Sequence, residues 1–127
     1  PDGRSFETYK TILDGDGHGI FNGKIYVYED AQRTDAKQTN QGLLLSPAAK
    51  FDTKPQLEIF ADDVKCTHGA TVGRLRDDAL FYLRARGIPE SEAKALLIQA
   101  FAAEAFARVS REDVREELHA ALLKKLA

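Results

Sequence analysis

The sequence has only one cysteine, Cys66, among its 127 residues, and it contains neither methionine nor tryptophan. One cysteine excludes a disulfide within the chain, which suits a reducing compartment. No stretch of about 18 apolar residues and no charged-then-apolar leader is present, so we expect neither a membrane span nor a signal peptide. The formal net charge is −2 without any long run of lysine and arginine, which argues against nucleic acid as a partner.

The composition that remains, 43% hydrophobic and 30% charged, is typical of a globular protein. Over residues 1–73 the sequence alternates in short bursts, which indicates strands. Turn-rich segments containing Gly, Asn and Asp separate these bursts, and no helical period intervenes. We predict an all-β unit with five strands, at residues 6–12, 25–28, 43–45, 57–60 and 64–68.

The arrangement of these strands stays open, because a β-sandwich and a parallel β-helix both use short strands and polar corners. Asn22-Gly23 is the strongest hairpin signal, since both residues tolerate the positive φ of tight turns. The polar run 31–40 is either an outer strand or a loop. Periodicity alone favours neither architecture.

Residues 74–127 change to a helical period, and the apolar face of the first helix consists of Leu75, Ala79, Tyr82 and Leu83. Gly87 suits the end of this helix and Pro89 the first turn of the next. The second helix, from about Pro89 to Arg108, is apolar almost all round and should be buried on more than one side. Ser110 and Asp113 resemble a capping box that opens a third helix. We predict a three-helix unit.

Cys66 and His68 are the residues with the most chemical potential, because two positions apart on a strand they share a face. Such a pair serves a thiolate–imidazole nucleophile or two ligands of a soft metal. The local sequence supplies neither an orienting base nor further ligands, so a buried Cys and a partly satisfied His is the better interpretation from the residues alone. Any metal site would need another chain.

The other candidate motifs have simpler interpretations. The segment Asp14–Gly19 begins like a calcium loop, but its twelfth position is Ile25 where a glutamate is required, so we predict a turn. His18 and His119 each stand alone, and we expect them to be solvated or locally hydrogen-bonded.

Ordered stretches over almost the whole chain closely resemble the C-terminal part of the SufB/SufD family of iron–sulfur cluster assembly scaffolds. The matching segments are residues 19–25, 31–36, 43–46, 52–59, 61–73 and 86–89 together with the helix that follows. Family members are several times longer, so the chain looks like the last third of one. The Cys66-Thr67-His68-Gly69 form resembles SufD, because SufB members typically have a glutamate directly after the histidine.

The resemblance implies a mainly β protein with α-helices: the last coils of a right-handed parallel β-helix over residues 1–73, then a three-helix domain over 74–127. Asn22-Gly23 would then be a corner between coils. The family implies a cytoplasmic protein, or a plastid one in a plant, that is a scaffold and not an enzyme. The resemblance further implies that this protein pairs with SufB through the β-helix and binds the ABC-type ATPase SufC through the helical domain.

The resemblance also assigns roles to residues. His68 matches a SufD histidine implicated in cluster assembly at the SufB interface, as a metal ligand completed by a partner chain, with Cys66 beside it. No cofactor is expected to stay bound to this chain, and the iron–sulfur cluster is transient in the full complex. The region expected to contact the ATPase comprises Tyr82, Arg86, Gly87, Ile88 and Pro89.

Two further expectations accompany this interpretation. A β-helix that acts enzymatically on polysaccharide is the alternative, and it would need acidic or basic clusters along an open groove. An isolated run of coils exposes unpaired strand edges, so we expect self-association through residues 1–30.

Overall fold

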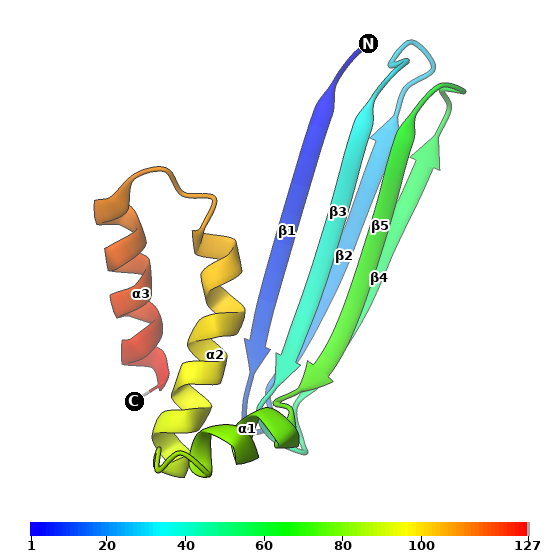
Figure 1. The fold of residues 1–127 in the computed structure, drawn as a ribbon. Coiled ribbons are helices and arrows are strands. Elements are labelled where there is room, and N and C mark those ends of the chain that lie inside the picture. Colours follow the sequence, from blue (N-terminus) through cyan, green and yellow to red (C-terminus); the bar gives the residue numbers. More distant parts are fainter. Residues whose placement is uncertain (127) are drawn as a thin grey trace. The chain divides into compact units, whose positions relative to one another are not determined.

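The computed structural model describes residues 1–126 and divides the chain into two compact units, Pro1–Arg74 and Leu75–Ala127. The first unit contains strands and the second helices (Figure 1). No described helix combines the length and the apolar character needed to cross a membrane.

The first unit contains five strands of ten residues each: β1 (Arg4–Leu13), β2 (His18–Val27), β3 (Asp35–Leu44), β4 (Lys50–Ile59) and β5 (Lys65–Arg74). Each predicted strand overlaps one of them, but apart from the first each covers half or less of the true strand. The missed parts are the polar ones, such as the first eight residues of β3.

The five strands alternate between two parallel sheets, one ordered β1-β3-β5 and the other β2-β4. The sheets face each other, as the ribbon shows (Figure 1). Across the space between them, the Tyr9 and Phe21 rings lie 4.8 Å apart and Asn40 Nδ2 donates a hydrogen bond of 2.6 Å to Thr53 Oγ1. Because the backbone ladder of each strand runs only within its own sheet, side chains fill the interior between the sheets.

The prediction of a right-handed parallel β-helix is wrong for this chain. The described strands form two small open parallel sheets of three and two strands, with no closed or solenoidal sheet. A sheet grows only by backbone pairing with a neighbouring strand. Because successive strands alternate between the two sheets, five strands give sheets of only three and two strands.

Two local predictions are also corrected. Asn22-Gly23 is neither a hairpin turn nor a corner, since both residues lie in the middle of β2. Gly23 is needed there because a Cβ at this position would lie 2.5 Å from Gln38 Oε1. The polar run 31–40 is not an outer strand, because it enters β3, the central strand of its sheet. Tertiary pairing overrides the turn and loop signals at both places.

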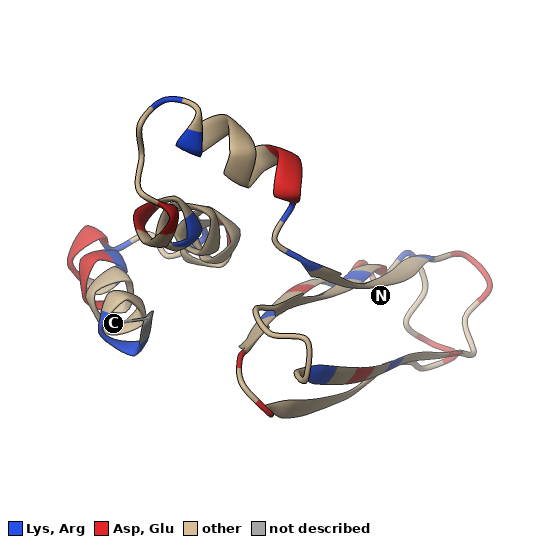
Figure 2. Cartoon of the chain, turned by 90° about the horizontal axis from the view of Figure 1, so that it is seen from below, with Lys and Arg blue, Asp and Glu red and all other residues tan. Residues whose placement is uncertain are grey.

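The second unit contains three helices: α1 (Asp77–Arg84), α2 (Glu90–Phe106) and α3 (Glu112–Leu126). Gly87 has a φ of +86° and Pro89 directly precedes α2, which confirms the predicted corner. Acidic first turns and basic last turns of α1 and α3 complement the helix dipoles (Figure 2).

The predictions for the burial of α2 and for the start of α3 differ from the structure. On α2, Ala93, Ile98 and Ala102 are buried but Leu96 is 41% exposed, so burial on more than one side is incomplete. The capping box is wrong: α3 begins at Glu112, beyond Ser110, and the Asp113 carboxylate instead accepts hydrogen bonds from Arg111. This guanidinium holds the pKa of Asp113 below its usual range.

Candidate functional site

Cys66 and His68 both lie on β5, which is the edge strand of the three-stranded sheet. Since they are two residues apart, their side chains leave the same face of the sheet. Cys66 is half-buried and His68 is exposed. The pair is therefore at the accessible rim of the β unit.

Strand register shows which face this is. Cys66 is in register with Ala36 on β3, and His68 is in register with Gln38, which is itself in register with Glu7 on β1. Residues in register in a parallel sheet share a face, and Ala36 and Gln38 are both only 2% exposed. Cys66 and His68 therefore lie on the face of the sheet directed toward the second sheet.

The buried face of β3 is polar. Gln38 Nε2 donates a hydrogen bond of 3.2 Å to Glu7 Oε2, and Asn40, which is 0% exposed, donates one to Thr53. The carbonyl oxygens Gln38 Oε1 and Asn40 Oδ1 are buried without a hydrogen-bond partner. A buried hydrogen-bond acceptor without a partner destabilises the fold, so such acceptors are uncommon in proteins unless they have a functional role.

Sequence reasoning missed Glu7, Gln38 and Asn40. A signal was present: at the start of β3, Ala36, Gln38 and Asn40 carry no charge, whereas Asp35 and Lys37 on the alternate positions do. The interior face of this strand is therefore indicated by an alternation of charged and uncharged residues, and not by an alternation of polar and apolar ones.

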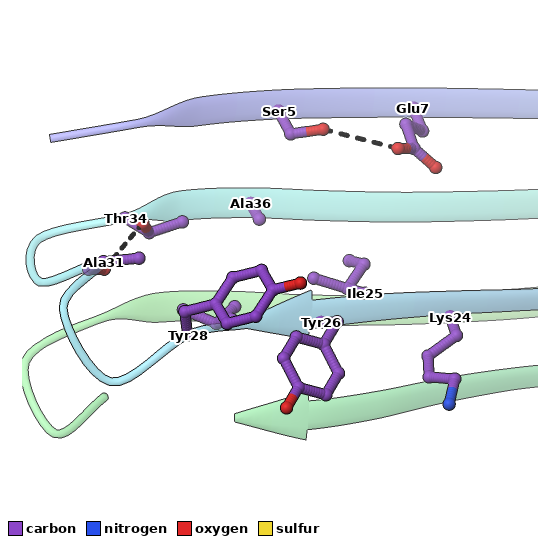
Figure 3. Close-up of a pocket in the computed structure, with 10 residues that line it drawn as sticks. Ser5, Glu7, Lys24, Ile25, Tyr26, Tyr28, Ala31, Thr34 and Ala36 are labelled. Atoms are coloured by element: carbon purple, nitrogen blue, oxygen red, sulfur yellow. Dashed lines mark hydrogen bonds between the residues drawn. The ribbon is translucent and has the colours of Figure 1, made fainter. Parts of the chain in front are cut away.

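A cavity of about 310 Å³ opens at the β1 side of the same interior. Figure 3 shows Ser5 and Glu7 on β1 joined by a hydrogen bond, Ala36 on β3, Tyr26 on β2 of the facing sheet, and Tyr28 directly after β2. The row formed by Glu7, Gln38 and His68, here called the polar row, thus runs from this cavity to the β5 edge.

The donors for a metal at this edge are few. Among residues 1–126, no three His, Cys, Asp or Glu side chains gather closely enough to hold a metal ion. Cys66 and His68 supply one thiol and one imidazole, ligand types that suit iron and zinc. Since a complete shell takes about four ligands, these two residues provide half of one at most.

The other two histidines have partners of their own. His18 Nε2 lies 2.6 Å from Asp52 Oδ2 on the exposed outer face of the β2-β4 sheet. His119 was predicted to be solvated or locally hydrogen-bonded, but its ring packs edge-on against Phe106 at 5.0 Å. Neither lies on the strand that carries the Cys66 thiol.

The predicted ATPase-contact residues lie together at the α1–α2 corner. The Arg86 guanidinium lies 3.4 Å from the centroid of the Tyr82 ring, and its Nη1 donates to the Tyr82 carbonyl oxygen. The Ile88 amide donates to the Leu83 carbonyl oxygen across Gly87, which ties the corner to α1. Tyr82 stays 55% exposed, so the corner is both ordered and accessible.

Glu90 anchors the far side of this corner. Its carboxylate pairs with Lys94 at 2.7 Å and with Arg84 at 3.4 Å, linking α2 to the end of α1. The hydrogen bond from Lys94 and the positive charges of Lys94 and Arg84 hold the pKa of Glu90 below its usual range.

Residues 1–101 match a family model described as the SufBD core domain of the SUF system for iron–sulfur cluster assembly. The matched residues contain the two-sheet unit with Cys66 and His68 at its rim, and α1 and part of α2. The chain belongs to the SufBD family of iron–sulfur cluster assembly proteins.

Within that family the chain matches the C-terminal part of SufD. It is 47% identical over 122 residues, 96% of its length, to the iron–sulfur cluster assembly protein SufD of Escherichia coli K12. It is 47% identical over 104 residues to a SufBD family protein of Synechocystis, and 40% identical over 118 residues to the chloroplastic protein ABCI7 of Arabidopsis thaliana. The chain spans 29%, 23% and 25% of these relatives, respectively.

Proposed function

We propose that this chain is part of a SufD-like scaffold subunit that completes a cluster-assembly site with a partner chain. The supporting observation is the position of His68, exposed on an edge strand beside Cys66, with no third ligand gathered there among the described residues. An iron–sulfur cluster under construction is the cargo, and a SufB-like scaffold supplies the missing ligands. His68 is the ligand that this chain contributes first, and Cys66 is a secondary one.

The two units take separate partners in this proposal. The β unit pairs with the SufB-like scaffold, for which the unpaired edge of β5 offers backbone donors and acceptors. The helical unit binds a SufC-like ABC ATPase through the corner at Tyr82, Arg86, Gly87, Ile88 and Pro89. The scaffold does no chemistry of its own. It acts in the cytoplasm, or in the plastid for a plant protein, as the chloroplastic relative does.

The experiment for the cluster site is a comparison of His68→Ala with His18→Gln, an exposed histidine on the outer face of the other sheet. Each variant is produced with the SufB-like and SufC-like partners, and cluster accumulated on the complex is measured by absorbance and iron content. We expect His68→Ala to reduce cluster at least tenfold, about 1.4 kcal/mol in binding terms, and His18→Gln to leave it unchanged. Equal cluster content in both variants would contradict the proposed role.

The ATPase contact has its own test. Tyr82→Ala removes an accessible aromatic ring from the corner, and Leu123→Ala on α3 removes an apolar side chain of similar exposure, 46% against 55%. We expect the first to lower co-purification of the SufC-like ATPase and the second to leave it intact. Retention of the ATPase by the Tyr82 variant would place the contact elsewhere.

The polysaccharide-enzyme alternative receives no support from the family match, which covers residues 1–101 with a cluster-assembly domain.

A further inference from the structure

We propose that Gln38 is a positioning residue for His68: its unpartnered Oε1 accepts a hydrogen bond from Nδ1–H of the imidazole and so leaves Nε2 free as the metal ligand. This inference rests on the proposed cluster-site role of His68. It concerns the polar row Glu7, Gln38 and His68, whose members are in register on three adjacent strands.

The orientation of the Gln38 amide follows from Glu7. An ionised carboxylate only accepts hydrogen bonds, so the side of the amide that faces β1 must be its NH₂ group, and Nε2 indeed donates to Glu7 Oε2 at 3.2 Å. The carbonyl oxygen is consequently the group left for the neighbour on the opposite side. That neighbour, in register on β5, is His68.

The amide cannot move out of this position easily. Gln38 is 2% exposed, and Gly23 on the facing sheet packs so close that a Cβ there would lie 2.5 Å from Oε1 and 2.7 Å from Nε2. The oxygen has no hydrogen-bond partner. A rigid, buried and unsatisfied acceptor beside an exposed imidazole is a preorganised place for that imidazole to dock.

Docking requires only that His68 turn from its exposed position onto the neighbouring strand, about 4.8 Å away in a sheet. A neutral imidazole carries one N–H, so donation by Nδ1 fixes the tautomer with an unprotonated Nε2. Histidines that bind metal are held in this way by an acceptor on the other ring nitrogen. Gln38 thereby sets which nitrogen is presented at the β5 edge.

The test is the tautomer of His68, which a merely structural role of Gln38 would not set. The full chain is labelled with ¹⁵N-histidine, and long-range proton–nitrogen correlations are recorded at mildly alkaline pH. His18→Gln and His119→Gln variants assign the signals. We expect the Nδ1–H form to dominate for His68, and Gln38→Met to shift the ratio of the two tautomers about fivefold or more toward Nε2–H.

Asn40→Leu is the matched control, because Asn40 is the other buried amide with an unpartnered oxygen but is in register with Ala70 instead of His68. It should leave the His68 tautomer unchanged. A dominant Nε2–H form in the unmodified chain overturns the proposal even if Gln38→Met fails to fold, and so does an unchanged ratio in a folded Gln38→Met.

The outcome is separable from that of the proposed function. Loss of cluster in His68→Ala with an Nε2–H tautomer would keep the cluster site and remove Gln38 from it. The Nδ1–H tautomer, lost in Gln38→Met, together with full cluster in His68→Ala would establish the Gln38 contact and remove the cluster role.

Discussion

Gly23 on β2 lies directly against the Gln38 amide on β3, so that a Cβ at position 23 would be 2.5 Å from Oε1 and 2.7 Å from Nε2. This contact crosses between the two sheets and explains why a glycine occupies the middle of a strand, where it is otherwise unfavourable. It also holds the central member of the polar row in place.

Gly23→Ala should destabilise the β unit by about 1–3 kcal/mol, because the added methyl group overpacks a buried contact. The control is Gly69→Ala on β5, where an added Cβ meets no atom within 4 Å and the effect should stay within about 0.5 kcal/mol. Urea denaturation followed by circular dichroism measures both. Equal stability of the two variants would mean that the Gln38 amide moves aside at no cost.

Asn40→Leu should cost about 1–3 kcal/mol, since it leaves the Thr53 hydroxyl without the hydrogen bond that Asn40 Nδ2 donates. Replacing both partners, as Asn40→Leu with Thr53→Val, should recover most of this loss because no polar group is then left unpaired. A double-mutant cycle by urea denaturation determines the coupling. Additive losses would show that the pair does not interact in solution.

His68→Ala should change the free energy of unfolding by no more than about 0.5 kcal/mol, because the side chain is exposed on an edge strand. Thermal or urea unfolding of the variant provides the check. A loss of several kcal/mol would show instead that His68 supports the fold, and a defect in cluster content would then have to be reassessed.

The helical unit should lose stability in acid through Glu90. Its folded pKa lies below the unfolded value, owing first to the Lys94 hydrogen bond and then to the charges of Lys94 and Arg84. This contribution is fully present above the ordinary glutamate pKa of 4.5 and is lost as the pH falls through the lower folded value. The free energy of unfolding of the chain and of Lys94→Ala is measured between about pH 6 and about pH 2, the range in which carboxylates titrate. The variant should lose less stability in acid than the unmodified chain.

Prediction from the sequence succeeded where structure is local. The ends of α1 and α2 follow from Gly87 and Pro89, whose backbone preferences act within a few residues. The same is true of the turn at Gly15, which has a φ of +56°. The placement of Cys66 and His68 on one strand was also within reach, since it needs only a local extended conformation.

The sheets were harder to predict, because each strand pairs with one that lies some thirty residues away, as Arg4 does with Asp35. Polar segments of β3 and β4 have weak strand propensity and are strands because their neighbours supply hydrogen bonds. The prediction of a β-helix was wrong for the same reason, since the number of strands in a sheet and their pairing depend on contacts between distant segments.

The sequence by itself determined the presence of three helices, the corner at Gly87 and Pro89, the turn at Gly15, the position of the Cys66–His68 pair on a strand and the family to which the chain belongs. Each of these depends on residues close together in the chain or on ordered motifs. Only the tertiary structure decided that Gln38 and Asn40 are interior and that Glu7, Gln38 and His68 form one row. Register between distant strands places these side chains on a common buried face, and no local propensity encodes that register.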